Sequence, residues 1–274
     1  MDRANALLAG LITVALAHVG SACSSDVSER GNRPLGPTPS TAQAAAEGPK
    51  ATSATSVTST TSDPPTSTSS SAGAPMPSVR YLALGDSFTI GTGSSPSEAF
   101  PARLAEAWSQ CKVDLTNLAK NGFTSGDVLR VEVPRAGDIA PTFVTVAAGA
   151  NDIVQRVPEG RYRDHLKSIF RALRDANVAP DHTVALPQPD WSLSPAAKDF
   201  GEPATIAARI ERYNAILAEE ATSAGARYVD IFPLMRELAQ RGMIAGDGLH
   251  PSAKAHAAWA QALAAQLGSC GAFR

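Results

Sequence analysis

The chain has 274 residues and a formal net charge of −2 at pH 7, and 43% of its residues are hydrophobic. Acidic and basic residues are interspersed, so nothing in the composition indicates a nucleic-acid partner. The sequence lacks the motifs that mark common metal sites and phosphate loops, which are His-Glu-x-x-His, Cys-x-x-Cys and Gly-x-x-x-x-Gly-Lys. Sites built on these motifs are thereby excluded. We therefore expect chemistry that needs no cofactor and no metal.

Residues 1–22 have the pattern of an export signal. The apolar stretch from Ala6 to Val19 is too short to span a membrane. Small residues before Cys23 resemble the processing site of bacterial lipoproteins, in which the cysteine is lipidated, although Gly20 stands where an apolar residue is usual. We expect an envelope lipoprotein, in the periplasm or at the cell surface and held to the membrane through Cys23. A plain cleaved signal peptide and secretion are the alternative.

Residues 23–78 are rich in Ser, Thr, Ala and Pro and contain almost no large apolar side chains. Such a segment cannot bury enough apolar surface to fold, so we expect a disordered tether. A tether of this length suits an enzyme held away from a membrane. A ligand-binding or glycosylated stalk is the alternative interpretation.

From residue 79 to 274, short apolar runs alternate with longer helical periods, which is typical of a parallel sheet with crossover helices. Apolar residues at helical spacing mark two of the helices, around 162–173 and 206–217. We expect one α/β domain over this whole region. The expected strands are Tyr81–Leu84, Val113–Asn117, Phe143–Ala147, Thr183–Leu186 and Tyr228–Ile231.

Polar motifs follow three of these strands, and a fourth motif precedes the last helix. Doubly wound sheets bind their ligands at the carboxyl ends of the strands, where these motifs would lie. In this order the motifs resemble those of the SGNH, or GDSL, hydrolase superfamily, over about residues 80–260. They are Gly85-Asp-Ser87, Asn121-Gly122, Gly149-Ala-Asn151-Asp152 and Asp247-Gly-Leu-His250.

The resemblance implies a flavodoxin-like, three-layer doubly wound fold with a five-stranded parallel sheet. It also implies a carboxylic ester hydrolase in which Ser87 is the nucleophile and His250 the base, oriented by Asp247. Ser87, Gly122 and Asn151 would supply the N–H donors of the oxyanion hole. Phe88 replaces the leucine that is commoner after the serine in this superfamily.

The residue types suit this chemistry. A serine hydroxyl is a weak nucleophile until a base takes its proton, and histidine has an ordinary pKa near 6.5. An aspartate three residues before the histidine can bond one ring nitrogen and leave the other to face Ser87. At the oxyanion hole, a glycine allows close backbone approach and an asparagine amide donates N–H without a charge.

Each motif taken singly also has an ordinary structural explanation. Gly122 could be a turn glycine, Asn151 and Asp152 a helix cap, and Asp247 part of a plain turn. Together the motifs favour the hydrolase interpretation. A catalytically silent surface-binding module with the same fold is the alternative of a different class.

Three cysteines divide naturally into one lipid attachment site and one pair. Cys111 is expected at the end of the domain's first helix, and Cys270 just past its last. These two helices can pack side by side, and an exported compartment permits a disulfide between the cysteines. Two unpaired thiols are the alternative.

The loop Leu186–Pro195 follows the fourth expected strand and contains Pro-Asp-Trp. We expect Trp191 to form a wall of the substrate pocket, and the equally weighted alternative is that it anchors the loop to the core.

Short acyl esters, including O-acetylated carbohydrate, are the expected substrates. The alternatives are lysophospholipase, lipase or thioesterase activity.

Overall fold

The computed structural model describes residues 75–274. The predictions for residues 1–22, for Cys23 and for nearly all of the tether therefore lie outside the described residues. The first strand begins at Ser78, one residue before the expected start of the folded domain. Among the described residues, no helix is long and apolar enough to cross a membrane.

All the expected strands are present in the described part of the chain. The strands are β1 (Ser78–Gly85), β2 (Lys112–Asn117), β3 (Phe143–Ala147), β4 (Thr183–Ala185) and β5 (Arg227–Tyr228). The helices are α1 (Ser87–Ile90), α2 (Phe100–Ala107), α3 (Ser125–Asp127), α4 (Ala136–Ile139), α5 (Ala150–Val154), α6 (Glu159–Asp175), α7 (Pro203–Ser223), α8 (Phe232–Gln240) and α9 (Ala253–Leu267). Shorter helical turns include η3 (Val128–Glu132), η6 (Trp191–Leu193) and η8 (Cys270–Phe273).

The strands form one five-stranded parallel sheet in the order β2-β1-β3-β4-β5. This is the flavodoxin-like order of a doubly wound fold, and its switch point lies between β1 and β3. The expected fold class is confirmed. Because every strand is parallel, the carboxyl ends of all of them lie at one edge of the sheet.

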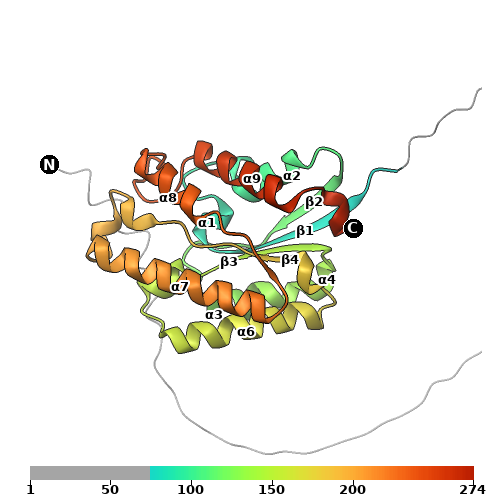
Figure 1. Ribbon diagram of the computed structural model, residues 1–274, viewed down its shortest axis with the longest axis horizontal. Coiled ribbons are helices and arrows are strands. Elements are labelled where there is room, and N and C mark those ends of the chain that lie inside the picture. Colours follow the sequence, from blue (N-terminus) through green and yellow to red (C-terminus); the bar gives the residue numbers. More distant parts are fainter. Residues whose placement is uncertain (1–74) are drawn as a thin grey trace, which may run out of the picture. The chain divides into compact units, whose positions relative to one another are not determined.

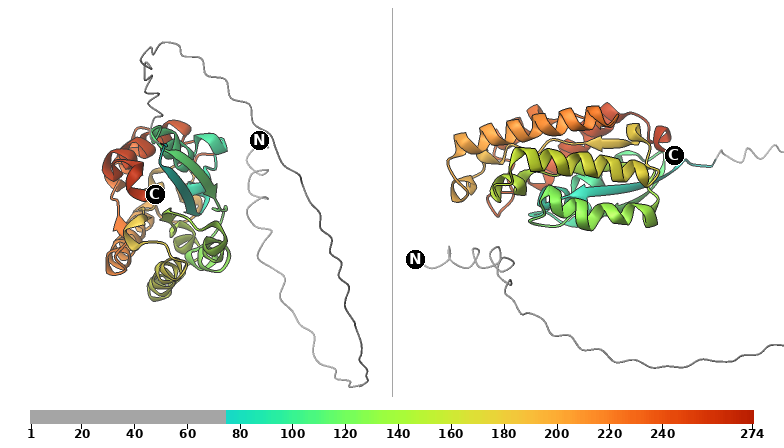
Figure 2. Two further views of the ribbon diagram at one scale, coloured as in Figure 1. Left: turned by 90° about the vertical axis from the view of Figure 1, so that its right-hand side faces the viewer. Right: turned by 90° about the horizontal axis from the view of Figure 1, so that it is seen from below.

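Helices cover both faces of the sheet, so the domain has three layers (Figure 1). Helices α6 and α7 run along one face with α3 and α4 beside them, and α2, α8 and α9 cover the other (Figure 2). Successive side chains of a strand point to opposite faces. Accordingly Leu82 and Leu84 of β1 join the apolar core under α6 and α7, whereas Tyr81 and Ala83 join the core under α2 and α9.

Strand β1 begins three residues earlier than expected and ends one later, and β2, β4 and β5 each differ by one residue at one end. Two further differences have a physical cause. Strand β5 ends at Tyr228 rather than Ile231, because Asp230 accepts a hydrogen bond from the N–H of Phe232 (2.9 Å) and so begins helix α8. Helix α2 ends at Ala107, so Cys111 lies in the turn before β2 and not on the helix. The pairing of Cys111 is as expected, since it forms a disulfide with Cys270.

Candidate active site

The predicted site residues follow three adjacent strands of the sheet. Ser87 lies two residues after β1, Gly122 lies in the loop after β2, and Asn151 lies in the first turn of α5 after β3. The end of β2 is joined to α1 by a hydrogen bond from the Nδ2 of Asn117 to the carbonyl of Thr89 (3.0 Å). The strand order therefore brings these three positions to the switch point of the sheet.

Ser87 is the first residue of α1, and its side chain is close to fully buried (9% exposed). The preceding residue, Asp86, caps this helix by accepting the N–H of Phe88 at Oδ1 (3.0 Å). A capped helix start fixes the backbone N–H of Ser87 and the direction of its side chain. The conformation thus suits both roles predicted for Ser87.

The alternative explanation of Asn151 as a helix cap does not hold. Gly149 occupies the N-cap position of α5, and the Nδ2 of Asn151 donates instead to the carbonyl of Phe123 (3.1 Å). An amide nitrogen carries two hydrogens, so one N–H of Asn151 is left for another acceptor. Gly122, one residue before Phe123, has φ +80°, in the left-handed region that favours glycine.

Asp247 and His250 are joined on a small hairpin between α8 and α9. Ile244 pairs with Pro251 across it, and the N–H of Ala245 donates to the carbonyl of His250 (2.7 Å). The Oδ2 of Asp247 lies 2.7 Å from the Nδ1 of His250. The Nε2 of His250 is the ring nitrogen that this contact leaves available.

Hydrogen bonds control the ionisation of Asp247. Burial opposes its charged form, but hydrogen bonds from the N–H groups of Leu249 (2.9 Å) and His250 (3.0 Å) and from the His250 ring outweigh burial and lower its pKa. Asp247 is therefore a carboxylate at neutral pH. A carboxylate at this place keeps the proton of a neutral imidazole on Nδ1 and leaves Nε2 free to accept one.

The hairpin packs directly against the loop that follows α1. A Cβ built on Gly93 would lie 2.5 Å from the Cβ of Ala245 and 3.2 Å from the Oδ2 of Asp247. The rings of Phe88 and His250 are 5.2 Å apart. These contacts bring His250 beside the segment that carries Ser87, although the hydrogen bonds among residues 75–274 include none between the Ser87 hydroxyl and His250.

With this arrangement in view, the comparisons with known proteins identify the family. The profile of the GDSL-like lipase/acylhydrolase family matches residues 83–258, more than half of the chain. The chain belongs to this family. Membership makes it an ester-hydrolysing enzyme and confirms the resemblance found in the sequence. No curated protein matches the chain.

Solved structures of TesA and of two esterases share the fold. TesA is 19% identical over 69% of this chain and 97% of its own, with a TM-score of 0.55. The esterase EstA from Pseudoalteromonas sp. is 20% identical over 69% and 96%, with a TM-score of 0.55. Axe2, an acetylxylan esterase from Geobacillus stearothermophilus, is 17% identical over 72% and 97%, with a TM-score of 0.57.

The GDSL domain also buries a second histidine near His250. His256 is fully buried in α9, and its Nδ1 lies 3.3 Å from the backbone N–H of Phe100. Burial lowers its pKa to about 4, and the nearby His250 adds to this effect. His256 is therefore a neutral packing residue at pH 7. In the described part of the GDSL domain, no three His, Cys, Asp or Glu side chains gather as metal ligands would.

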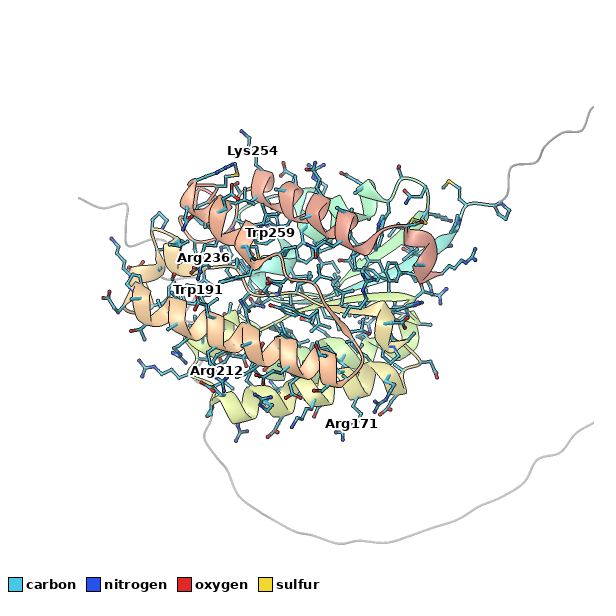
Figure 3. The ribbon with its side chains drawn as sticks, in the orientation of Figure 1. Arg171, Trp191, Arg212, Arg236, Lys254 and Trp259 are labelled. Atoms are coloured by element: carbon cyan, nitrogen blue, oxygen red, sulfur yellow. A yellow bond between two sulfur atoms is a disulfide. The ribbon has the colours of Figure 1, made fainter. Side chains whose placement is uncertain are left out.

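Trp191 is buried (4% exposed), and its ring packs edge-on against Phe200 at 5.8 Å. The loop around it is held by Asp190, which accepts a hydrogen bond from the Nε of Arg236 (2.7 Å); Figure 3 labels Trp191 and Arg236. Burial favours the anchoring interpretation of Trp191. Its role as a pocket wall stays a prediction, since Trp191 also lines a narrow cavity that reaches Phe88.

Sequence reasoning missed a buried carboxyl pair behind Ser87. Glu132 in η3 is 1% exposed, and its Oε2 accepts the N–H of Gly85 (2.8 Å). Burial raises its pKa to about 8, although the Gly85 hydrogen bond opposes the shift, and the charge of Asp86 raises it further. Burial likewise raises the pKa of Asp86 to about 7, opposed by the Phe88 hydrogen bond. The only signal of this pair in the sequence is that Glu132 stands between two apolar residues, Val131 and Val133.

This pair predicts a pH dependence of stability. Both pKa values are higher in the folded chain than in the unfolded one, so the folded chain binds more protons between about pH 4 and pH 8. Stability is then greatest below the unfolded values and falls as the pH rises through 7 to 8. Glu132→Gln keeps an acceptor for Gly85. Since one unit of pKa shift corresponds to about 1.4 kcal/mol, this variant should lose a pH-dependent fall of a few kcal/mol in the free energy of unfolding.

Urea unfolding of the wild type and of Glu132→Gln from pH 5 to pH 9 measures this dependence. Glu106→Gln, on the exposed surface of α2, is the matched control and should keep the wild-type slope. A Glu132→Gln curve parallel to that of the wild type would contradict the assignment.

The close approach at Gly93 predicts a loss of activity. Gly93 has φ +86°, and an added Cβ must displace the hairpin that carries Asp247 and His250. A displacement of about 1 Å in catalytic groups typically costs on the order of a hundredfold. We therefore expect Gly93→Ala to lower kcat by about 10- to 100-fold. Gly137→Ala, where a Cβ meets no atom within 4 Å, should leave kcat unchanged.

Proposed function

We propose that the protein hydrolyses carboxylic esters through an acyl-enzyme, with Ser87, His250 and Asp247 as its catalytic triad. The observation that carries this proposal is the 2.7 Å contact between Asp247 and the Nδ1 of His250, on a hairpin packed against the Ser87 segment. The nucleophile comes from the segment after β1, and the base and its orienting carboxylate come from one hairpin before α9. This division of roles is that of the Ser-His-Asp triad.

In the first half of the reaction, the Oγ of Ser87 attacks the ester carbonyl carbon while the Nε2 of His250 takes the hydroxyl proton. The carbonyl oxygen becomes negative, and the N–H groups of Ser87, Gly122 and Asn151 stabilise it. Asp247 stabilises the imidazolium that forms. The C–O bond to the alcohol then breaks, and His250 returns its proton to the leaving oxygen.

In the second half, a water molecule attacks the acyl carbon of the Ser87 ester, and His250 takes a proton from this water. Collapse of the second tetrahedral intermediate breaks the bond to the Oγ of Ser87, which regains a proton from His250. The products are a carboxylic acid and a free alcohol, so atoms and protons balance without any co-reactant.

We propose short acyl esters, such as O-acetylated carbohydrate, as the substrates. Phe88 lines two narrow cavities beside the Ser87 segment, and each has room for about one water molecule (≈ 10 and ≈ 20 Å³). The open groove lined by Ile90, Thr92 and Asn121 is larger, at ≈ 480 Å³. Neither of the two narrow cavities can take a long acyl chain without rearrangement. The structural similarity to Axe2, an acetylxylan esterase, points the same way.

A p-nitrophenyl ester series from acetate to palmitate tests this function with the full chain. We expect turnover that declines beyond short chains, and Ser87→Ala should lower it by about 10⁴-fold or more. Ser97→Ala, at an exposed serine of the neighbouring loop, is the matched control. Equal activity of Ser87→Ala and the wild type would refute the triad, whereas a preference for palmitate would refute the short-chain proposal.

We also propose that the protein is exported and anchored by a lipid on Cys23. The disulfide between Cys111 and Cys270 supports export, because such bonds persist in oxidising compartments. Mass spectrometry of the mature protein should find a diacylglycerol-modified cysteine at its N-terminus, and Cys23→Ser should release the protein from membranes. An unmodified N-terminus after cleavage would favour the secreted form.

A further inference from the structure

One short helix holds the loop that carries the predicted oxyanion donor Gly122. Asn151 lies in α5 and Gln155 directly follows this helix. The Nε2 of Gln155 donates to the carbonyl of Gly122 (3.1 Å), and the Nδ2 of Asn151 donates to the carbonyl of Phe123 (3.1 Å). Asn151 and Gln155 are four residues apart and so lie on the same helix face. The two bonds hold consecutive peptide groups of the loop.

Asp152 holds the same loop two residues further on. Its Oδ2 accepts the backbone N–H of Ser125 (2.7 Å), and its Oδ1 accepts the Ser125 hydroxyl (2.5 Å). Both side chains are fully buried. The Nδ1 of His165, on α6, lies 2.9 Å from the same hydroxyl. The Ser125 hydroxyl donates its one hydrogen to Asp152, so it can accept from His165 when the Nδ1 carries the ring proton.

This arrangement does not form a second hydrolase site. Ser125 lies between the carboxylate and the imidazole, whereas a triad needs the imidazole between the other two groups. The fully buried hydroxyl of Ser125 also offers no access to an ester carbonyl. What the hydrogen bonds do achieve is to tie the Gly122–Ser125 segment to α5, the helix that carries Asn151.

Gly122 has open space at the place where a side chain would stand. A Cβ built on Gly122 would meet no atom within 4 Å, and its φ of +80° belongs to a residue with wide backbone freedom. An oxyanion hole nevertheless requires its donors at 2.7 to 3.1 Å from the developing charge. The hydrogen bonds from α5 therefore contribute directly to the precision that the donor at Gly122 needs.

We propose that Gln155 and Asp152 are positioning residues, which set the separation between the two oxyanion donors Gly122 and Asn151. This inference rests on the proposed function, and neither side chain needs to touch the substrate. Gln155 fixes the donor loop directly at Gly122, and Asp152 fixes the far end of the same loop at Ser125. Loss of either bond lets Gly122 move relative to Asn151.

The sharper test uses Gln155, because its side chain is exposed and its replacement leaves the core intact. Gln155→Ala should lower kcat by about three- to tenfold with KM unchanged. Gln155→Glu should lower it further, since a carboxylate would face the carbonyl of Gly122. Val154→Ala, at the adjacent exposed position, is the matched control and should retain wild-type kcat.

A second measurement separates positioning from a general loss of structure. A trifluoromethyl ketone forms a tetrahedral adduct with a serine nucleophile and places a negative oxygen in the oxyanion hole. Its inhibition constant should rise by the same factor by which kcat/KM falls in the Gln155 variants, while the pH dependence of kcat stays unchanged. Rates are expressed per active site, counted from the burst of p-nitrophenol, so that unfolded protein does not contribute.

Asp152 supplies a rescue experiment. Asp152→Ala should lower kcat by about 100-fold, whereas Asp152→Asn keeps one oxygen acceptor, for the backbone N–H of Ser125, and should recover part of that loss. Gln155 variants that match Val154→Ala in kcat and in inhibitor affinity would overturn the inference while Ser87-dependent activity stands. Absence of Ser87-dependent hydrolysis in the wild type would instead overturn the proposed function itself.

Discussion

Asp247→Asn is expected to lower kcat for a short acyl ester by about 10³- to 10⁴-fold without unfolding the protein. An asparagine can still accept the N–H groups of Leu249 and His250 through its oxygen, so the hairpin keeps its conformation. Its NH₂ group would then face the Nδ1 of His250. That nitrogen would have to act as an acceptor, which moves the imidazole proton to Nε2 and leaves no base beside Ser87.

The pH dependence distinguishes this mechanism from a loss of structure. The Asp247→Asn enzyme should keep the wild-type unfolding free energy within about 1 kcal/mol and should lose kcat at every pH between 5 and 8. Asp138→Asn, whose side chain is 85% exposed on α4, is the matched control. An Asp247→Asn enzyme within tenfold of the wild type would show that His250 does not depend on this carboxylate for its tautomer.

The sheet could be predicted from the sequence because each strand carries a local signal. Strands buried on both faces are continuous apolar runs, and β1 and β3 lie in such runs. Strand β5 is short and half-buried at the sheet edge. The apolar residues of the sequence extend beyond it into the turn at Asp230, so the predicted end of this strand was wrong. The family motifs also follow strands directly, which is why Ser87, Gly122 and Asn151 could be placed at one edge.

The contacts that hold the site together carry no such local signal. Glu132 meets Gly85 across 47 residues, and Ser125 meets Asp152 across 27. Each contact depends on how two elements that are distant in the sequence pack together, and no hydrophobic period reports that packing. From the sequence alone, Gly93 is an ordinary loop glycine. Its close approach to Ala245 could not be predicted, because Ala245 lies at the other end of the domain's sequence.

Removing the disulfide is expected to lower the free energy of unfolding by about 5 kcal/mol. Cys111 and Cys270 are 159 residues apart, and the chain-entropy relation gives roughly this value for a loop of that length. Both sulfur atoms are buried, so the double variant Cys111→Ala with Cys270→Ala adds no unpaired polar group. Urea unfolding of the double variant and of the oxidised wild type measures the difference.

Activity should survive this change at temperatures where the variant stays folded. Cys111 directly precedes β2, so the disulfide lies at the amino ends of the strands, whereas Ser87 follows the carboxyl end of β1. The native contacts around the disulfide also remain, since the Nε1 of Trp108 donates to the carbonyl of Gly268 (3.0 Å) and Phe273 packs against Phe143 at 4.6 Å. The disulfide then stabilises the fold chiefly by restricting the unfolded chain. A folded double variant with reduced kcat would show instead that the two ends of the sheet are coupled.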